Sequence, residues 1–175
     1  MAGHDPTTPT PDIAAELAAV RHRLDVLESR EEIRSLRTRF HDYVNTDRWD
    51  EIGGLFSADA ELDYDYLGSA SERQAIDEFF GAIPRLLPDG EGGPFVRQFS
   101  HAHAIAVDGE TATGSSHLFA TPVYHGQSFV VSARFADRYG RHDGTWLFDS
   151  VAMTVWYSVP LEQGWAGADR HHMRL

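Results

Sequence analysis

The residues between Arg30 and Tyr66 form an unbroken series of local patterns that predicts a long helix, a short helix and a strand. Apolar side chains first recur at the spacing of one helical face, with charged side chains mostly on the other face. The apolar set is Ile33, Leu36, Phe40, Tyr43 and Val44, and the charged set is Arg34, Arg37, Arg39 and Asp42. Apolar and acidic residues then alternate strictly from Ala60 to Tyr66, which predicts a strand that carries Tyr64 and is exposed to solvent on one face.

Between the long helix and this strand, Thr46 or Asp47 can cap a second helix by accepting hydrogen bonds from its free amides. The buried side of that helix would be Trp49, Ile52, Leu55 and Phe56. Upstream, apolar residues from Ile13 to Leu27 also keep helical spacing. We interpret them as a helix that supports an oligomer or caps the core, and that either continues into the long helix or ends near Ser29.

The second half of the chain has the pattern of a helix followed by a meander of strands. Ser71 can cap a helix whose buried side is Ile76, Phe79, Phe80 and Ile83 and which ends before Pro84. The Gly- and Pro-rich run 88–94 predicts a loop, which could act as a lid or simply connect two elements. Strands are predicted over 95–107, 110–124, 127–139 and 145–157, with turns at Asp108-Gly109, His125-Gly126 and Asp143-Gly144. Helices followed by an antiparallel meander indicate an α+β fold.

Length, charge and composition limit the number of domains and the kinds of partner and chemistry that the chain can have. The 175 residues fit one domain, which we place at 13–160 between a disordered leader, 1–12, and a C-terminal tail, 161–175. A net charge of −12 makes nucleic acid an unfavourable partner. The absence of cysteine excludes disulfides and thiolate chemistry. No segment has the length of a membrane span or the pattern of a signal peptide, so we expect a cytoplasmic protein without membrane contact.

Three groups of residues resemble the SnoaL-like branch of the nuclear transport factor two-like superfamily, which includes scytalone dehydratase, bile-acid dehydratases and polyketide cyclases. The first group is Ile33, the turn 45–50, Leu55-Phe56, Asp59-Ala60 and Leu62-Asp63-Tyr64; the others are 107–112 and 139–146. The resemblance implies a cone-shaped fold in which N-terminal helices pack on a curved, mostly antiparallel sheet and enclose a cavity. These residues are scaffold, and the fold supports many chemistries.

The family register pairs Gln98 with Ala120 and places Ser116 opposite Ala102. With that register, small side chains gather on one face of the meander, and we expect this face to line the cavity. It would include Leu118 and Phe135, and Ala152, Thr154 and Trp156 from the last strand. The opposite face would carry a row of His101, His117 and Arg134, interpreted as an oligomer interface unless a bulge turns the row inward.

In the dehydratase-like relatives a helix Asp and a strand His form an acid–base dyad. By position these residues fall on Asn45 and Gln98, and neither amide can exchange a proton near neutral pH. His41 lies one helical turn before Asn45, and an ordinary histidine pKa suits acid–base work. Tyr64 matches a strand tyrosine that contacts substrate or its bound water in scytalone dehydratase.

The sequence therefore predicts a cofactor-independent cyclase, isomerase or dehydratase that acts on an apolar cyclic or polyketide-like small molecule. The alternative is a non-catalytic binding protein of the same fold that has lost its dyad. The candidate catalytic residues are His41, Asn45, Tyr64 and Gln98, joined by His101 and His117 if the row turns inward. The candidate walls are Phe40, Val44, Phe79, Phe80, Leu118, Phe135 and Trp156. We expect no metal and no cofactor, and a homodimer, or else a trimer, built on the outer sheet face.

Overall fold

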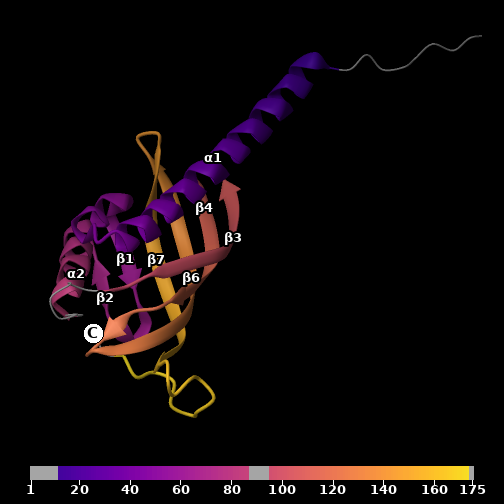
Figure 1. Ribbon diagram of the computed structural model, residues 1–175. Coiled ribbons are helices and arrows are strands. Elements are labelled where there is room, and N and C mark those ends of the chain that lie inside the picture. Colours follow the sequence, from indigo (N-terminus) through magenta and orange to yellow (C-terminus); the bar gives the residue numbers. More distant parts are fainter. Residues whose placement is uncertain (1–11, 87–94, 174–175) are drawn as a thin grey trace, which may run out of the picture.

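The computed structural model describes residues 12–86 and 95–173, and Figure 1 shows a long helix lying across a curved sheet. Helix α1 runs without a break over Ile13–Asn45, so the two predicted N-terminal segments are one helix. Asp12 caps it, because its side chain accepts from the amides of Ala14 and Ala15. Most of the expected leader and the expected loop over 88–94 lie outside the described residues.

The sheet has the strand order β2-β1-β7-β6-β4-β3, with β5 paired to β6. The strands are β1 Phe56–Asp63, β2 Ser69–Ser71, β3 Gln98–Asp108, β4 Thr111–Ala120, β5 Val123–Tyr124, β6 Gln127–His142 and β7 Thr145–Pro160. The pairings between these strands are antiparallel except that of β1 with β7. At the His125-Gly126 and Asp143-Gly144 turns both residues have positive φ, as the predicted tight hairpins require.

The stretch after α1 forms two 3₁₀ turns, η1 Trp49–Glu51 and η2 Gly53–Leu55, instead of the predicted α-helix. Two consecutive glycines disfavour a continuous helix here. An added Cβ at Gly53 would lie 1.7 Å from the Asp77 carboxylate, so that side chain would have to move. Trp49, Ile52 and Leu55 are buried as expected, whereas Phe56 begins β1.

Tyr64 lies just beyond β1, at the start of the 3₁₀ turn η3 Asp65–Leu67, rather than within the strand. Helix α2 spans Arg73–Leu86 and includes Pro84, so the prediction that it ends before Pro84 was wrong. A proline in the last turn removes only one helical hydrogen bond, which the helix tolerates. Ser71 belongs to β2 and does not adjoin the helix.

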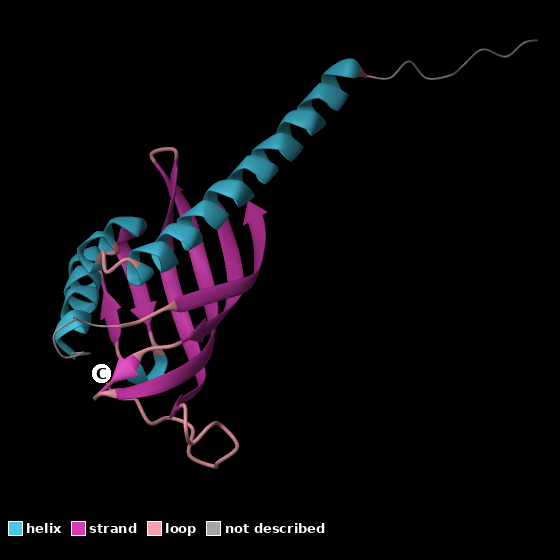
Figure 2. Cartoon of the chain, in the orientation of Figure 1, coloured by secondary structure: helices cyan, strands magenta, loops and turns pink. Residues whose placement is uncertain are grey.

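Figure 2 shows that α2 and the C-terminal half of α1 lie on the same side of the sheet. The hydrophobic core is formed by residues of these helices and of the strands. From α1 the core receives Ile33, Leu36, Phe40 and Val44, all at most 1% exposed. The opposing strands supply Phe56, Phe135, Tyr139 and Phe148. No helix in the described part of the chain is long and apolar enough to cross a membrane.

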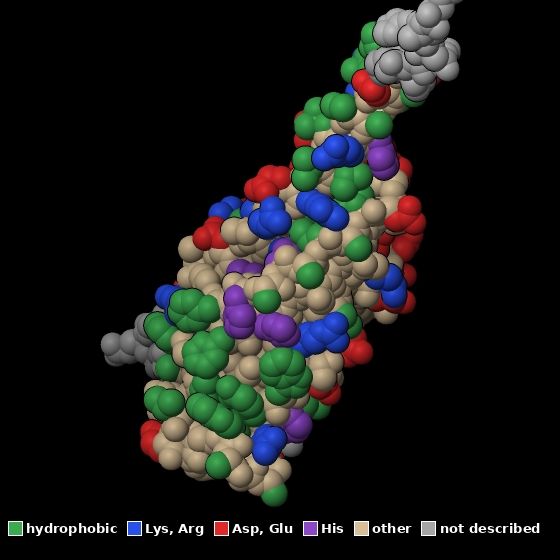
Figure 3. Space-filling view, turned by 90° about the vertical axis from the view of Figure 1, so that its right-hand side faces the viewer, with side chains coloured by type: hydrophobic (Ala, Val, Ile, Leu, Met, Phe, Trp, Pro, Cys, Tyr) green, Lys and Arg blue, Asp and Glu red, His purple; other side chains and the backbone are tan. Residues whose placement is uncertain are grey.

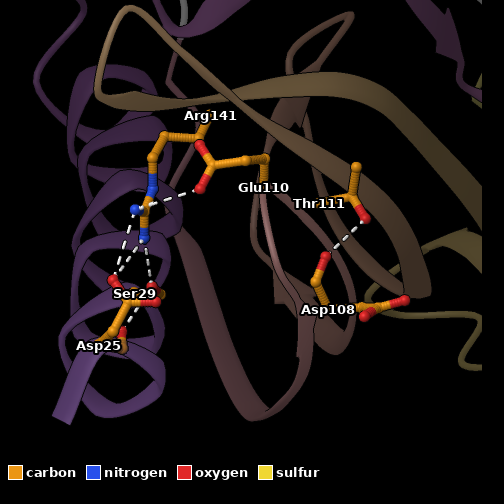
Figure 4. A network of polar contacts seen from close by, with 6 residues as sticks. All are labelled: Asp25, Ser29, Asp108, Glu110, Thr111 and Arg141. Atoms are coloured by element: carbon orange, nitrogen blue, oxygen red, sulfur yellow. Dashed lines mark hydrogen bonds and ion pairs between the residues drawn. The ribbon is translucent and has the colours of Figure 1, made fainter. Parts of the chain in front are cut away.

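Arg141 on β6 fastens the middle of α1 to the sheet (Figure 4). Its guanidinium donates to the Ser29 hydroxyl at 2.6 Å and lies 3.3 Å from the Asp25 carboxylate. The same group lies over the Trp146 ring, 5.0 Å from its centre. Toward the N-terminus of α1, this anchor is close to the end of the contact between the helix and the rest of the protein, because every residue from Ile13 to Asp25 is exposed.

Candidate active site

A cavity of about 70 Å³ lies between the end of α1, α2 and the inner face of the sheet. Its walls are almost entirely apolar, and among its described lining residues Tyr64, Trp49 and Gln98 supply the side-chain hydrogen-bonding groups. Leu118, Ala120 and Val131 line it from the sheet, and Met153 and Met173 close another side. Its volume exceeds that of two water molecules but is below the roughly 300 Å³ of sites for drug-sized ligands.

Two donors in this wall have no hydrogen-bond partner among the described residues: the Tyr64 hydroxyl and the Trp49 indole N–H. Both side chains are nearly buried, at 5% and 6% exposure. An unpaired buried polar group costs roughly 1–3 kcal/mol, so such groups in a native fold call for an explanation. Burial raises the pKa of Tyr64 above its ordinary value, opposed by the Arg37 charge. Tyr64 therefore remains a neutral donor.

At the two dyad positions, the Asn45 side chain is hydrogen-bonded to the Gln98 backbone. The Asn45 side chain donates to the Gln98 carbonyl at 2.9 Å and accepts from the Gln98 amide at 2.6 Å. This pair of bonds fixes the end of α1 to the start of β3. The nitrogen and the oxygen of the Asn45 side chain therefore both hold the β3 backbone, and Gln98 has its side chain left for other contacts.

That side chain contacts His41. The Gln98 Oε1 lies 2.8 Å from His41 Nδ1, so Nδ1 carries the proton and Nε2 is an acceptor, which is buried and unpartnered within the described structure. Burial, and then the nearby Arg37 charge, lower the pKa of His41 to about 3. The ordinary near-neutral value expected from sequence does not apply, and His41 is a neutral, weakly basic imidazole at physiological pH.

A buried ionic network lies beside His41. Arg37 on α1 pairs with Asp137 on β6, and the Tyr139 hydroxyl donates to the second oxygen of Asp137 at 2.8 Å. His103 Nε2 lies 3.2 Å from the Tyr139 hydroxyl. Burial opposes the charge of Arg37, but Asp137 and Tyr139 outweigh it and raise the Arg37 pKa. The guanidinium also lies over the Phe135 ring, 4.5 Å from its centre.

A bulge in β3 brings His103 to this network. Gln98 pairs with Ala120 and His101 with His117, but the next paired residues are Ala104 and Ser115. Ser116 therefore faces the bulge, and the predicted pairing of Ser116 with Ala102 was wrong. Ala102 has a φ of 55°, the left-handed conformation that bulges use. Gly114 makes room for the network, since a Cβ there would lie 2.9 Å from the Tyr139 ring and 3.1 Å from His103 Nε2.

The bulge leaves the row of His101, His117 and Arg134 on the outer face. His101 pairs with His117 and His117 with Arg134, as the predicted register has it. His101 and Arg134 are exposed, and His117 is half-buried. The structure thus separates His101 and His117 from the cavity. Figure 3 shows hydrophobic side chains gathered below histidines on this face, where Phe99, Phe119 and Trp156 are exposed. The expected homodimer through this face remains a prediction.

The structure places three of the seven predicted wall residues at the cavity. Val44, Phe80 and Leu118 line the cavity. Phe40 and Phe135 are buried in the aromatic core beside it, and Phe79 packs on Tyr64 with ring centres 5.7 Å apart. Trp156 was misplaced: it is 47% exposed on the outer face, with its ring 5.4 Å from that of His117. Ala152 and Thr154 share the error, because β7 turns Val151, Met153 and Val155 inward instead.

Sequence reasoning missed Trp49 as a donor, Arg37 and Asp137 as a buried pair, and Met173 as a wall. Arg37 lies among charged residues that suggested an exposed face, although its spacing from Ile33 and Phe40 places it at the border of the apolar one. Met173 reaches the cavity because its amide donates to Ser158 and fixes the tail to β7. No group of three or more His, Asp or Glu in residues 12–86 and 95–173 is placed to hold a metal ion.

Helices on one side of an open, curved, mixed sheet around a small apolar cavity define an α+β cone-shaped fold. The model of the SnoaL-like domain family matches residues 25–152. The chain therefore belongs to the SnoaL-like family. None of the curated proteins matches it in sequence.

Solved structures share this fold at low sequence identity. A hexachlorocyclohexane dehydrochlorinase, LinA type 2, superposes with a TM-score of 0.71 at 19% identity, covering 86% of this chain and 97% of that one. A protein from Novosphingobium aromaticivorans, provisionally named a scytalone dehydratase, gives 0.67 at 18% identity with coverages of 86% and 97%. A protein of unknown function from Mycobacterium tuberculosis gives 0.64 at 20% identity with coverages of 86% and 81%. At these identities the likeness establishes the fold alone.

Proposed function

We propose that this protein is a cofactor-independent enzyme of the cyclase, isomerase or dehydratase kind, which binds an apolar small molecule through an oxygen atom of that molecule. One observation carries the proposal: Tyr64 and Trp49, which line the largely apolar cavity, each carry a buried donor that has no partner in the described structure. A ligand carbonyl, ether or hydroxyl oxygen would satisfy one or both donors, and the apolar walls would bury the rest of the ligand.

Such donors can accelerate a reaction without an acid–base dyad. If negative charge develops on the bound oxygen, fixed donors in a dry cavity stabilise the transition state more than the ground state. Confinement by the walls adds to this by holding a flexible substrate in a reactive conformation. Asn45 and Gln98 would support the site, Asn45 by fixing β3 and Gln98 by orienting His41.

The small volume restricts the substrate class. A molecule of polyketide size needs the walls to move, and the flexible side chains of Met153 and Met173 are the part of the wall best suited to this. A compact monocyclic molecule with a single oxygen acceptor needs the least rearrangement. We therefore favour small cyclic ketones, enones and hydroxyketones as first substrates to test.

The test is turnover of such a panel by the full-length protein, with products identified by mass spectrometry. For the substrate that reacts, Tyr64→Phe removes one donor and keeps the ring, and we expect the rate to fall about a hundred- to a thousandfold, as for loss of an oxyanion donor. Trp49→Phe should act in the same direction. Tyr157→Phe is the matched control, because Tyr157 stacks on Trp165 away from the cavity. Unchanged turnover in both Tyr64→Phe and Trp49→Phe would contradict the proposal.

A specific observation favours a second function, that of a binding protein. Among the described lining residues Tyr64 is the only one that titrates, and it remains protonated, so no lining group can serve as a general base near neutral pH. Native mass spectrometry of the purified protein separates the two functions. A ligand that is bound and recovered unchanged after prolonged incubation indicates a binding protein, whereas conversion of that ligand indicates an enzyme.

A further inference from the structure

The N-terminal half of α1 carries an apolar stripe that the body of the protein does not cover. Ile13, Leu17, Val20, Leu24 and Leu27 are between 48% and 73% exposed. They follow one another at intervals of four, three, four and three residues, which is the heptad spacing of a coiled coil. In Figure 1 this part of the helix extends away from the sheet as an arm.

The stripe lies on the side of α1 that faces away from the protein's own core. At about 100° per residue, its centre is on roughly the opposite side of the helix from Ile33, Leu36, Phe40 and Val44, which pack on the sheet. Arg141 anchors the helix through Asp25 and Ser29, on the side of the core (Figure 4). Bending the arm toward its own sheet would therefore leave the stripe in water. Within the described residues nothing covers the stripe, so a second molecule is the occupant that we consider.

The charges beside the stripe indicate which molecule fits. With Leu17 and Leu24 at position a, and Ile13, Val20 and Leu27 at position d, the flanking g positions hold Glu16 and Arg23 and the e positions hold Arg21 and Glu28. In a parallel coiled coil each g residue faces the e residue five places later in the neighbouring helix. Two identical arms would then pair Glu16 with Arg21 and Arg23 with Glu28. An antiparallel pairing of Leu17 with Leu27 and Val20 with Leu24 would instead oppose Arg21 to Arg21 and Arg23 to Arg23.

From this spacing, exposure and charge complementarity we propose that copies of this chain associate through residues 13–28 of α1 as a parallel, in-register coiled coil. Leucine at a with β-branched Ile13 and Val20 at d shifts parallel coiled coils from two strands toward three or four. Because each stripe faces away from its own sheet, the bodies lie outside the coil with their cavities free. The assembly is independent of the proposed active site.

Light scattering of the full-length protein at micromolar concentration tests the association. We expect an oligomer for the wild type and at least a twofold lower mass for Leu17→Ser/Leu24→Ser, whose changes fall on side chains that are exposed in the single chain. The matched control Ala15→Ser/His22→Ser changes the opposite side of the arm and should keep the wild-type mass. A monomeric wild type, or equal masses for wild type and Leu17→Ser/Leu24→Ser, would overturn the proposal; the latter would result from association through the outer sheet face.

Cysteine crosslinking tests the direction, and the absence of native cysteine makes each introduced thiol unique. In the parallel register Leu24→Cys meets its own equivalent and should form a disulfide-linked species under mild oxidation, whereas His22→Cys should not. Glu16→Arg should weaken the assembly through repulsion from Arg21, and Glu16→Arg/Arg21→Glu should restore it. Equal crosslinking of both cysteine variants, or no restoration in the charge-exchanged variant, would contradict the parallel arrangement.

Discussion

At the scale of single residues, the environment of each titratable group decides its chemistry more than its identity does. His41 has the residue type of a general acid–base, but burial and Arg37 lower its pKa to about 3. Tyr64 has a raised pKa and keeps its proton. The position of His41 on α1 followed from helical spacing. Its pKa could not, because Arg37, Gln98 and the covering rings reach it only through the tertiary fold.

The depressed pKa of His41 predicts a specific dependence of stability on pH. Unfolded His41 binds a proton below about pH 6.5, whereas folded His41 stays neutral down to about pH 3. The unfolded state therefore binds more protons between these values, and the free energy of unfolding falls as the pH falls. His41 alone should account for a loss of roughly 2 kcal/mol between pH 7 and pH 5.

Urea unfolding of the wild type and of His41→Gln at pH 7, 6 and 5 measures this loss. The variant should show a shallower decline over this range, with a remainder from His103, whose pKa burial also lowers. His22→Gln, on the exposed arm, should decline as the wild type does. Parallel curves for wild type and His41→Gln would show that His41 is not held neutral by the fold.

At the scale of elements, local patterns determined most of the secondary structure, and contacts between elements determined the exceptions. The helical spacing of Ile33 to Val44 and the Asp-Gly turn at 143–144 sufficed to predict the C-terminal part of α1 and the β6–β7 hairpin. The position of the bulge at Ala102 could not be predicted, because an alanine in the sequence does not indicate a left-handed backbone conformation. As a result, the pairing of Gln98 with Ala120 could be predicted, whereas the placement of His103 beside Tyr139 could not. Trp156 was misassigned by a register shift between β6 and β7.

The bulge predicts opposite effects of glycine at two alanines of β3. Ala102 has a φ of 55°, which glycine adopts at lower cost than alanine, so Ala102→Gly should stabilise the protein by up to about 1 kcal/mol. Ala104 lies in regular pairing with Ser115, where Ala104→Gly should destabilise by roughly 0.5–1 kcal/mol. Denaturant unfolding measures both. Equal signs for the two changes would show that residue 102 does not need the left-handed conformation.

At the scale of the whole molecule, the ionic pair of Arg37 and Asp137 joins α1 to the centre of the sheet across 100 positions of sequence. Both side chains are at most 2% exposed. The overall α+β cone was predictable from the order of helices and hairpins together with the family resemblance. This pair was not, because helical spacing alone placed Arg37 with exposed charges and gave Asp137 no partner.

This pair predicts strong non-additivity. Arg37→Met leaves the Asp137 charge buried beside Tyr139, and Asp137→Leu leaves the guanidinium buried among aromatic rings, so each change should cost roughly 3–5 kcal/mol of unfolding free energy. The double variant replaces both charges with apolar groups. Its unfolding free energy should therefore fall by much less than the sum of the losses in the two single variants.

Urea unfolding of the four proteins completes the cycle. The exposed pair of Arg138 and Glu61 provides the control, since Arg138→Met and Glu61→Leu should each change stability by less than about 1 kcal/mol and combine additively within error. If the Arg37 and Asp137 variants were also additive, the two charges would each be stabilised by separate partners. The connection between α1 and the sheet would then rest on the apolar core and on the hydrogen bonds between Asn45 and Gln98.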